Sequence, residues 1–246
     1  MNKVRLLSTS EEVLQLKTAV LLYESDRGAV YATTHAIEVD AEKPSRSVIG
    51  AGVPLSRVGL TKFAQAIDAA TAYAGFVPEN LLYTAPNMMA WWAPAVTRKA
   101  WFKGNQVGIG AQDGLVAHPA LVFVATPTSW RVFARRDSER PSLTTPLYHS
   151  PHFNVSADGR ICIGNIKMPP APSSDAIGQY EDAFYRSHFT HPNHAGAVKY
   201  RGGMPALWRD QLKNPDAEAM RGALKPTKTT LKSAIEKIAS SNRNAI

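Results

Sequence analysis

A series of short apolar runs, separated by turn residues, constrains the fold of this chain more than any other feature. The runs are strand-like, and Gly, Pro and Asn lie between them, which is typical of short strands joined by tight connections. They occupy residues 80–84, 88–92, 99–103, 120–125 and 130–135. The last two, LVFVA and WRVFARR, are separated by TPTS and predict an antiparallel hairpin.

The segments on either side complete the expected order of elements. Residues 14–24 and 29–39 flank the polar turn SDRG and predict a further hairpin. Apolar residues recur at three- and four-residue spacing over residues 60–74, just before Gly75, and predict an amphipathic helix. Later helices are expected over residues 175–189, from Pro205 onward, and in the tail on the stripe of Leu231, Ile235 and Ile238. Strands and helices are therefore segregated, which favours an α+β fold over an alternating α/β fold.

The glycine-rich segment GIGAQDG, residues 108–114, superficially resembles a phosphate-binding loop. Its glycines do not follow the G-x-G-x-x-G spacing, and no strand–turn–helix pattern surrounds it. We expect a flexible hairpin loop there.

Length and cysteine content set the broad class. A chain of 246 residues can bury a core without disulfides or metals, and its one cysteine excludes an internal disulfide. The N-terminus has no apolar run long enough for a signal peptide, and the longest apolar stretches are far shorter than the ~20 residues of a membrane span. These features predict a soluble, cytoplasmic protein that is not bound to a membrane.

The net charge of +8 raises the question of an acidic partner. Much of the excess lies near the C-terminus, and the other basic residues are scattered, without an arginine-rich stripe or an aromatic RNA-binding pattern. The C-terminal cations are Lys225, Lys228, Lys232, Lys237 and Arg243. A solvated basic tail explains this charge, while DNA or an acidic protein docked on the basic face stays an alternative.

The single cysteine, Cys162, follows the turn dipeptide Asp158-Gly159. A turn there would fold the chain back and bring Asn154 close to Cys162. An asparagine amide beside a thiol can donate a hydrogen bond to a developing oxyanion, and the thiolate is the attacking form of the cysteine. The competing interpretation is a buried structural cysteine and a turn-forming asparagine.

The same loop resembles the active-site loop of ubiquitin-conjugating enzymes, which reads His-Pro-Asn, then polar residues around a glycine, then Ile-Cys-Leu. Asn154 precedes Cys162 by eight residues, the usual spacing in that family. The matching positions are His152, Phe153, Asn154, Gly159, Ile161, Cys162 and Ile163. Within that superfamily the chain is similar to a divergent prokaryotic branch, the family of PRTRC system protein B, and FTHPN at residues 189–193 also looks like that branch. Phe153 in place of proline, and no acidic residue downstream, are departures from the pattern.

The resemblance implies an architecture and a reaction. It implies an N-terminal β-hairpin extension over residues 1–55, a ubiquitin-conjugating-like domain over 56–215, and a basic helical tail over 216–246. Cys162 would carry a small ubiquitin-like protein as a thioester, received from a ThiF-type adenylating enzyme, and Asn154 would stabilise the tetrahedral intermediate. No bound cofactor is expected, because the adenylating partner consumes ATP. The gene cassettes of the PRTRC branch also encode a JAB-type peptidase, which the resemblance implies as a further partner.

Three histidines in SHFTHPNH stand where the family often has its acidic residue. We choose His191 as the group that takes or orients the amine proton, with His188 and His194 as its competitors. A structural role or a weak zinc site is the alternative for these histidines.

Two other functions stay open. One is a Cys-His amide hydrolase, with Cys162 as nucleophile and His191 oriented by Asn193. Papain-like nucleophiles open a helix, whereas this cysteine follows a turn. The other is a non-catalytic module of the same fold that binds a protein partner or DNA.

Overall fold

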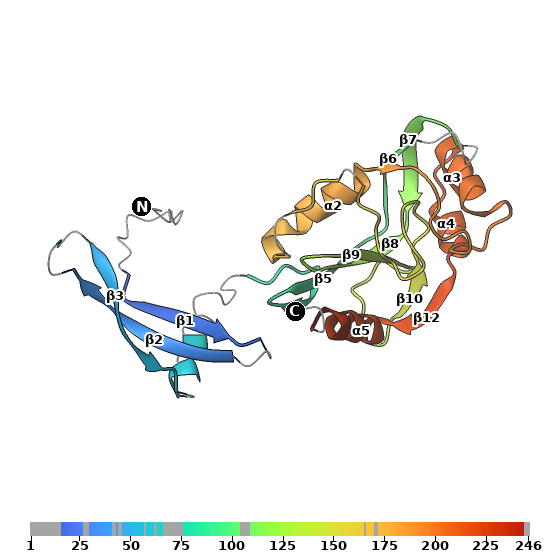
Figure 1. Ribbon diagram of the computed structural model, residues 1–246. Coiled ribbons are helices and arrows are strands. Elements are labelled where there is room, and N and C mark those ends of the chain that lie inside the picture. The colour runs from blue at the N-terminus through green and yellow to red at the C-terminus, as the bar shows by residue number, and fades with distance from the viewer. Residues whose placement is uncertain are drawn as a thin grey trace. The chain divides into compact units, whose positions relative to one another are not determined.

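The chain forms two compact units, residues Met1–Gly75 and Phe76–Ile246 (Figure 1). The computed structural model describes residues 16–26, 30–40, 43, 46–56, 58–61, 63–65, 76–103, 109–164, 166–169 and 172–243. The division at Gly75 differs from the boundaries at residues 55 and 215 that the sequence analysis expected.

The first unit contains a three-stranded antiparallel sheet in the order β1-β2-β3. The expected hairpin is present as β1 (Thr18–Glu24) and β2 (Val30–Val39), and β3 (Ser47–Pro54) is an addition that the sequence analysis missed. Glycines in β3 weakened its strand pattern. A Cβ at Gly52 would lie 2.5 Å from the His35 ring on β2, so glycine makes room for that ring. The helix expected over residues 60–74 is present over residues 58–61 and 63–65, and residues 62 and 66–74 lie outside the described part.

The second unit is built on a six-stranded antiparallel sheet in the order β12-β10-β9-β8-β5-β4. Its strands are β4 (Leu81–Ala85), β5 (Met88–Ala93), β8 (Ala120–Ala125), β9 (Trp130–Arg135), β10 (Pro146–His149) and β12 (Pro226–Thr230). The expected hairpin of LVFVA and WRVFARR is confirmed as β8 and β9, with Ala120 opposite Arg135. Every residue of β8 is buried, as expected for a central strand covered on both faces.

The strands β6 and β7, which lie between β5 and β8 in the sequence, belong to a separate sheet with the order β11-β6-β7. β6 (Val96–Phe102) pairs antiparallel with β7 (Gln112–His118) and parallel with the short strand β11 (His188–Phe189). Residues 112–114 therefore belong to a strand, and the expectation of a loop was wrong there. A Cβ at Gly114 would lie 3.1 Å from the Leu212 side chain, so this glycine allows a close helix contact.

Helices follow the strands, as expected for an α+β fold. They are the 3-10 turn η1 (Ser174–Ala176), α2 (Ile177–Tyr185), α3 (Gly203–Lys213), α4 (Ala217–Ala223) and α5 (Leu231–Arg243). The expected helix over 175–189 ends at Tyr185, where the chain enters β11, and α3 begins two residues before Pro205. Asp216 caps α4 by accepting from the backbone N–H of Glu218 and Ala219.

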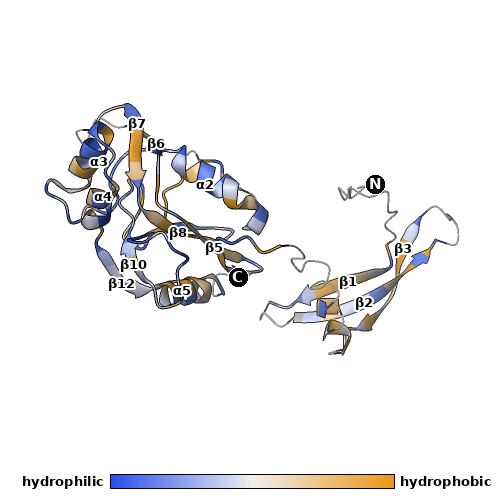
Figure 2. Cartoon of the chain, turned by 180° about the vertical axis from the view of Figure 1, so that it is seen from behind, coloured by the Kyte–Doolittle hydropathy of each residue, from blue (hydrophilic) through white to orange (hydrophobic). Residues whose placement is uncertain are grey.

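The core lies on both faces of the six-stranded sheet. On one face, α2 and α3 contribute to a large aromatic cluster that includes Trp91, Trp130 and Trp208. On the other face, the predicted stripe of α5 packs on Val122 and Val124. Figure 2 shows α3 carrying both hydrophobic and hydrophilic residues, as an amphipathic helix does. Helix α5 is therefore part of the core of the second unit. No helix in the described part is long and apolar enough to cross a membrane.

Candidate active site

The cysteine loop folds back on itself, as the Asp158-Gly159 dipeptide predicted. Gly159 has a φ of +82°, and its N–H donates to the Ser156 carbonyl at 2.9 Å. The N–H of Cys162 donates to the carbonyl of Asn154 at 2.7 Å. The turn thus places Cys162 directly opposite Asn154.

Strand β9 fixes the returning arm of this loop. The N–H of Ile161 donates to the Trp130 carbonyl at 2.8 Å, and the N–H of Val132 donates to the Gly159 carbonyl at 2.9 Å. A Cβ at Gly159 would lie 2.8 Å from the Phe133 ring and 3.1 Å from the Val132 carbonyl oxygen. Glycine is needed here both for the positive φ and for this close approach.

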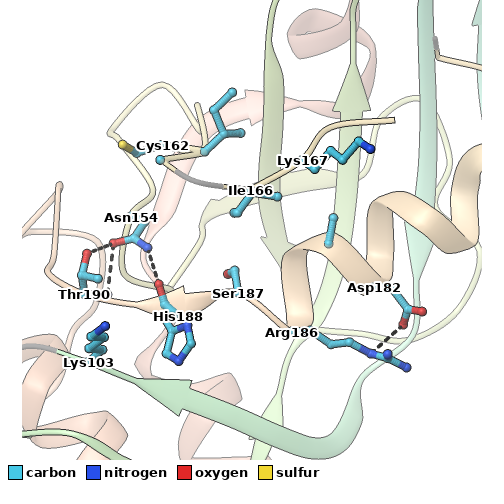
Figure 3. Close-up of a pocket in the computed structure, with 13 residues that line it drawn as sticks. Lys103, Asn154, Cys162, Ile166, Lys167, Asp182, Arg186, Ser187, His188 and Thr190 are labelled. Carbon is cyan, nitrogen blue, oxygen red and sulfur yellow. Dashed lines mark hydrogen bonds and ion pairs between the residues drawn. The ribbon is translucent and has the colours of Figure 1, made fainter. Parts of the chain in front are cut away.

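The thiol of Cys162 is free and exposed. Of the two flanking isoleucines, Ile161 is 6% exposed and anchors the arm, whereas Ile163 is 40% exposed. Figure 3 shows the sulfur on the outer side of the loop. The interpretation of Cys162 as a buried structural residue is therefore wrong.

The side chain of Asn154 connects the loop to strand β11 and the segment that follows it (Figure 3). Its Nδ2 donates to the His188 carbonyl at 2.8 Å, and its Oδ1 accepts from the Thr190 hydroxyl at 2.6 Å. The His188 carbonyl oxygen can only accept a hydrogen bond, so it must face Nδ2. The backbone N–H of Thr190, 3.2 Å from Oδ1, can only donate, so the two partners together assign the orientation of the amide. Asn154 has a φ of +62° and is 8% exposed. One Nδ2 hydrogen is used in this network, which leaves the second for another acceptor.

The Thr190 hydroxyl also determines the tautomer of His191. It lies 2.9 Å from Nδ1 of His191. Its single hydrogen goes to Oδ1 of Asn154, which carries no hydrogen, so Nδ1 of His191 must be the donor. In this tautomer the lone pair of the His191 ring lies on Nε2, and the side chain is exposed.

The three histidines of SHFTHPNH occupy different surroundings. The side chain of His188 lines a groove beside Cys162, His191 contacts Thr190, and the ring of His194 packs against His149 at a centroid distance of 4.7 Å. Among the described residues, no group of three or more His, Cys, Asp or Glu side chains is arranged to hold a metal ion.

A pair of buried histidines lies beneath the loop, and the sequence analysis did not find it. Nδ1 of His118 lies 2.9 Å from Nε2 of His152, and the Ser150 hydroxyl lies 2.9 Å from Nδ1 of His152. Burial, assisted by the positive charge of Arg98, lowers the pKa of His118 to about 3, and burial beside His118 also lowers the pKa of His152. Both rings are neutral at neutral pH and act as packing and hydrogen-bonding groups.

An open groove of about 830 Å³ adjoins the thiol. The cysteine loop, the end of α2, β11 and the end of β6 contribute its walls. Its lining consists of Lys103, Asn154, Cys162, Ile163, Gly164, Ile166, Lys167, Asp182, Ala183, Arg186, Ser187, His188 and Thr190. An exposed thiol, an amide donor and several cations thus share one surface depression.

The surroundings of Cys162 differ from those of a papain-like nucleophile. Cys162 does not open a helix: η1 begins only at Ser174, after a Pro-rich segment. The His191 ring contacts Thr190 rather than Asn193 among the described residues. The site therefore lacks the helix and the His–Asn pair that a papain-like hydrolase would use.

The mixed α+β fold, with its antiparallel sheets and few helices, fits an E2-like domain. Residues 59–227 match Prokaryotic E2 family D, and the chain belongs to that family. No curated protein and no solved structure matches the chain.

Proposed function

We propose that this protein carries a ubiquitin-like protein as a thioester on Cys162 and transfers it to an amine. The family match supports a conjugation-related role at the level of the superfamily. The observation that carries the proposal is the exposed thiol of the chain's single cysteine, held opposite Asn154 at the edge of a groove.

Two acyl transfers make up the reaction. In the first, the Cys162 thiolate attacks the C-terminal glycyl carbonyl of the acyl adenylate that a ThiF-type enzyme has made, the carbon–oxygen bond to AMP breaks, and AMP leaves. In the second, an amine attacks the thioester carbonyl, the carbon–sulfur bond breaks, and the thiolate of Cys162 leaves. The unused Nδ2 hydrogen of Asn154 is the proposed donor to the oxyanion, and Nε2 of His191 is the proposed acceptor of the amine proton.

The proposed partners are an adenylating enzyme, a small ubiquitin-like protein and, in a PRTRC-type cassette, a JAB-type peptidase. ATP would be consumed upstream, so the proposal needs no cofactor bound to this chain. The amine would attack after the acyl group has moved from the adenylating enzyme to Cys162.

Intact mass spectrometry tests the proposal directly. The protein is mixed with a ThiF-type enzyme, a ubiquitin-like protein and ATP. We expect an adduct of one ubiquitin-like protein minus water, which disappears on treatment with dithiothreitol. Cys162→Ser should give an adduct that resists the thiol, because an oxygen ester replaces the thioester, and Cys162→Ala should give none.

Iodoacetamide provides the control for access to the thiol. We expect the native protein to be alkylated once, at Cys162, because the side chain is exposed. Absence of the adduct, together with a native Cys162 that resists alkylation, would contradict the carrier function and favour a binding module. An adduct that water rather than an amine removes would instead favour the hydrolase.

A further inference from the structure

The groove beside Cys162 has an excess of positive charge. Lys103, Lys167 and Arg186 line it, and Asp182 is the one carboxylate among the described residues of the lining. Asp182 is already close to a cation, with its Oδ1 3.6 Å from Nε of Arg186. Within the part of the chain that the structure describes, neither lysine forms an ion pair.

The cations come from separate elements and surround the groove rather than converge. Lys103 follows β6, Lys167 belongs to the loop after Cys162, and Arg186 directly follows α2. Figure 3 shows Lys103 and Lys167 on different sides of the groove and Arg186 beside Asp182. A compact anion such as phosphate needs donors aimed at one point, whereas separated cations suit several carboxylates on an extended segment.

A second hollow adjoins the groove. It has a volume of about 280 Å³ and shares Lys103 and His188 with the groove. Trp101 of β6 also lines it, and its one acidic residue, Asp113, is paired with Lys99 at 2.5 Å. The two hollows therefore meet at Lys103 and His188.

We infer that this groove receives an acidic, extended segment of the donor, namely the residues just before its C-terminal glycine. The inference rests on the proposed function, since the thioester fixes the donor's carbonyl carbon on Sγ of Cys162. An extended chain advances about 3.3–3.6 Å per residue, so the two to four preceding residues lie within roughly 7–14 Å of the sulfur. The groove begins at Cys162 and thus coincides with that segment.

Synthetic peptide thioesters test the inference without any natural partner. Three mercaptoethanesulfonate thioesters end in two glycines and carry two Glu, two Gln or two Lys before them. The Cys162 thiolate attacks the peptide carbonyl, the peptide's carbon–sulfur bond breaks, and mercaptoethanesulfonate leaves. The second-order rate of acylation is followed by intact mass at low and high salt.

We expect the Glu peptide to react about five- to tenfold faster than the Gln peptide at low salt, and the Lys peptide to react most slowly. High salt should reduce the advantage to less than about twofold, because both partners are exposed. The double variant Lys103→Ala with Lys167→Ala should lose the preference, so that its rates with the Glu and Gln peptides become equal. Lys213→Ala with Lys232→Ala, two exposed lysines on α3 and α5, is the matched control and should keep the preference.

Different results overturn different statements. Equal rates for the Glu and Gln peptides, or a preference that survives loss of Lys103 and Lys167, would overturn the acidic donor segment and leave the carrier function intact. A preference for acid that appears only when the peptide is offered as the amine acceptor would also overturn the assignment to the donor. A Cys162 that exchanges with none of the three peptides would overturn the proposed function itself.

Discussion

The two arms of the cysteine loop differ in burial, although Asn154 and Cys162 lie only eight positions apart. In the first arm, residues 151–155 are all buried, and Trp208 donates its indole N–H to the Pro151 carbonyl at 2.7 Å. In the returning arm, residues 160 and 162–164 are exposed and Ile161 alone is inserted into the core. The first arm therefore anchors the loop in the core, and the returning arm presents the thiol to solvent. Stability and reactivity should therefore respond to different substitutions.

The largest effect on stability should come from Phe153→Ala in the buried arm. Phe153 is 1% exposed and packs edge-to-face on Phe102 with ring centroids 5.7 Å apart. Truncation of a buried phenylalanine costs about 3–5 kcal/mol through lost burial and a cavity. Ile163→Ala in the exposed arm is the matched control and should cost less than about 1 kcal/mol. Urea unfolding of both variants measures the difference, and equal losses would contradict the contrast between the arms.

A smaller loss is expected for Gly159→Ala at the turn that joins the arms. The new Cβ would meet the Phe133 ring at 2.8 Å in addition to the strain of the positive φ. We expect about 2–3 kcal/mol of destabilisation from these two causes together.

Gly164→Ala separates the two causes. Gly164 has a φ of +49° with nothing within 4 Å of a built Cβ, so it should lose only about 1 kcal/mol. Thermal unfolding of both variants compares them. Equal losses at the two positions would show that strain alone, and not contact with β9, determines the role of Gly159.

The pH dependence of stability should report on the buried arm. The pKa values of His118 and His152 are below their ordinary value of 6.5 in the folded protein, so the unfolded chain binds more protons as pH falls below that value. As the pH falls below 6.5, the free energy of unfolding should then decrease by up to about 1.4 kcal/mol per pH unit for each histidine. Above pH 7 these two histidines should have no effect on it. His118→Phe should reduce this slope between pH 6 and pH 4, and an unchanged slope would assign acid sensitivity to other groups.

The local part of this site could be predicted from the sequence, and the distant part could not. Asp158-Gly159 specifies a turn by itself, so the approach of Asn154 to Cys162 follows from a few residues. The partners of the Asn154 amide, by contrast, are 34 and 36 residues away, and the His118–His152 contact spans 34 residues. These contacts depend on where β11 and β7 pack. The separate sheet of β6, β7 and β11 was missed for the same reason, because β11 has only two residues and no pattern of its own.

The smallest expected effect concerns the Thr190 hydroxyl, which links Asn154 of the cysteine loop to His191, the proposed base. Thr190→Val removes the hydroxyl that accepts from Nδ1 of His191 while keeping the shape of the side chain. Without that acceptor, both neutral tautomers of the ring become accessible, and only one has its lone pair on Nε2. We expect transfer from the Cys162 thioester to free lysine to slow by about five- to tenfold, with acylation of Cys162 unchanged.

The conservative variant Thr190→Ser distinguishes orientation of the base from simple packing. It restores the hydroxyl and should recover most of the transfer rate, although it lacks the methyl group that valine retains. The double variant Thr190→Val with His191→Ala should be no slower than His191→Ala alone. Additive losses in the double variant would show that Thr190 acts on Asn154 rather than on His191, since Oδ1 of Asn154 is the other group that its hydroxyl contacts.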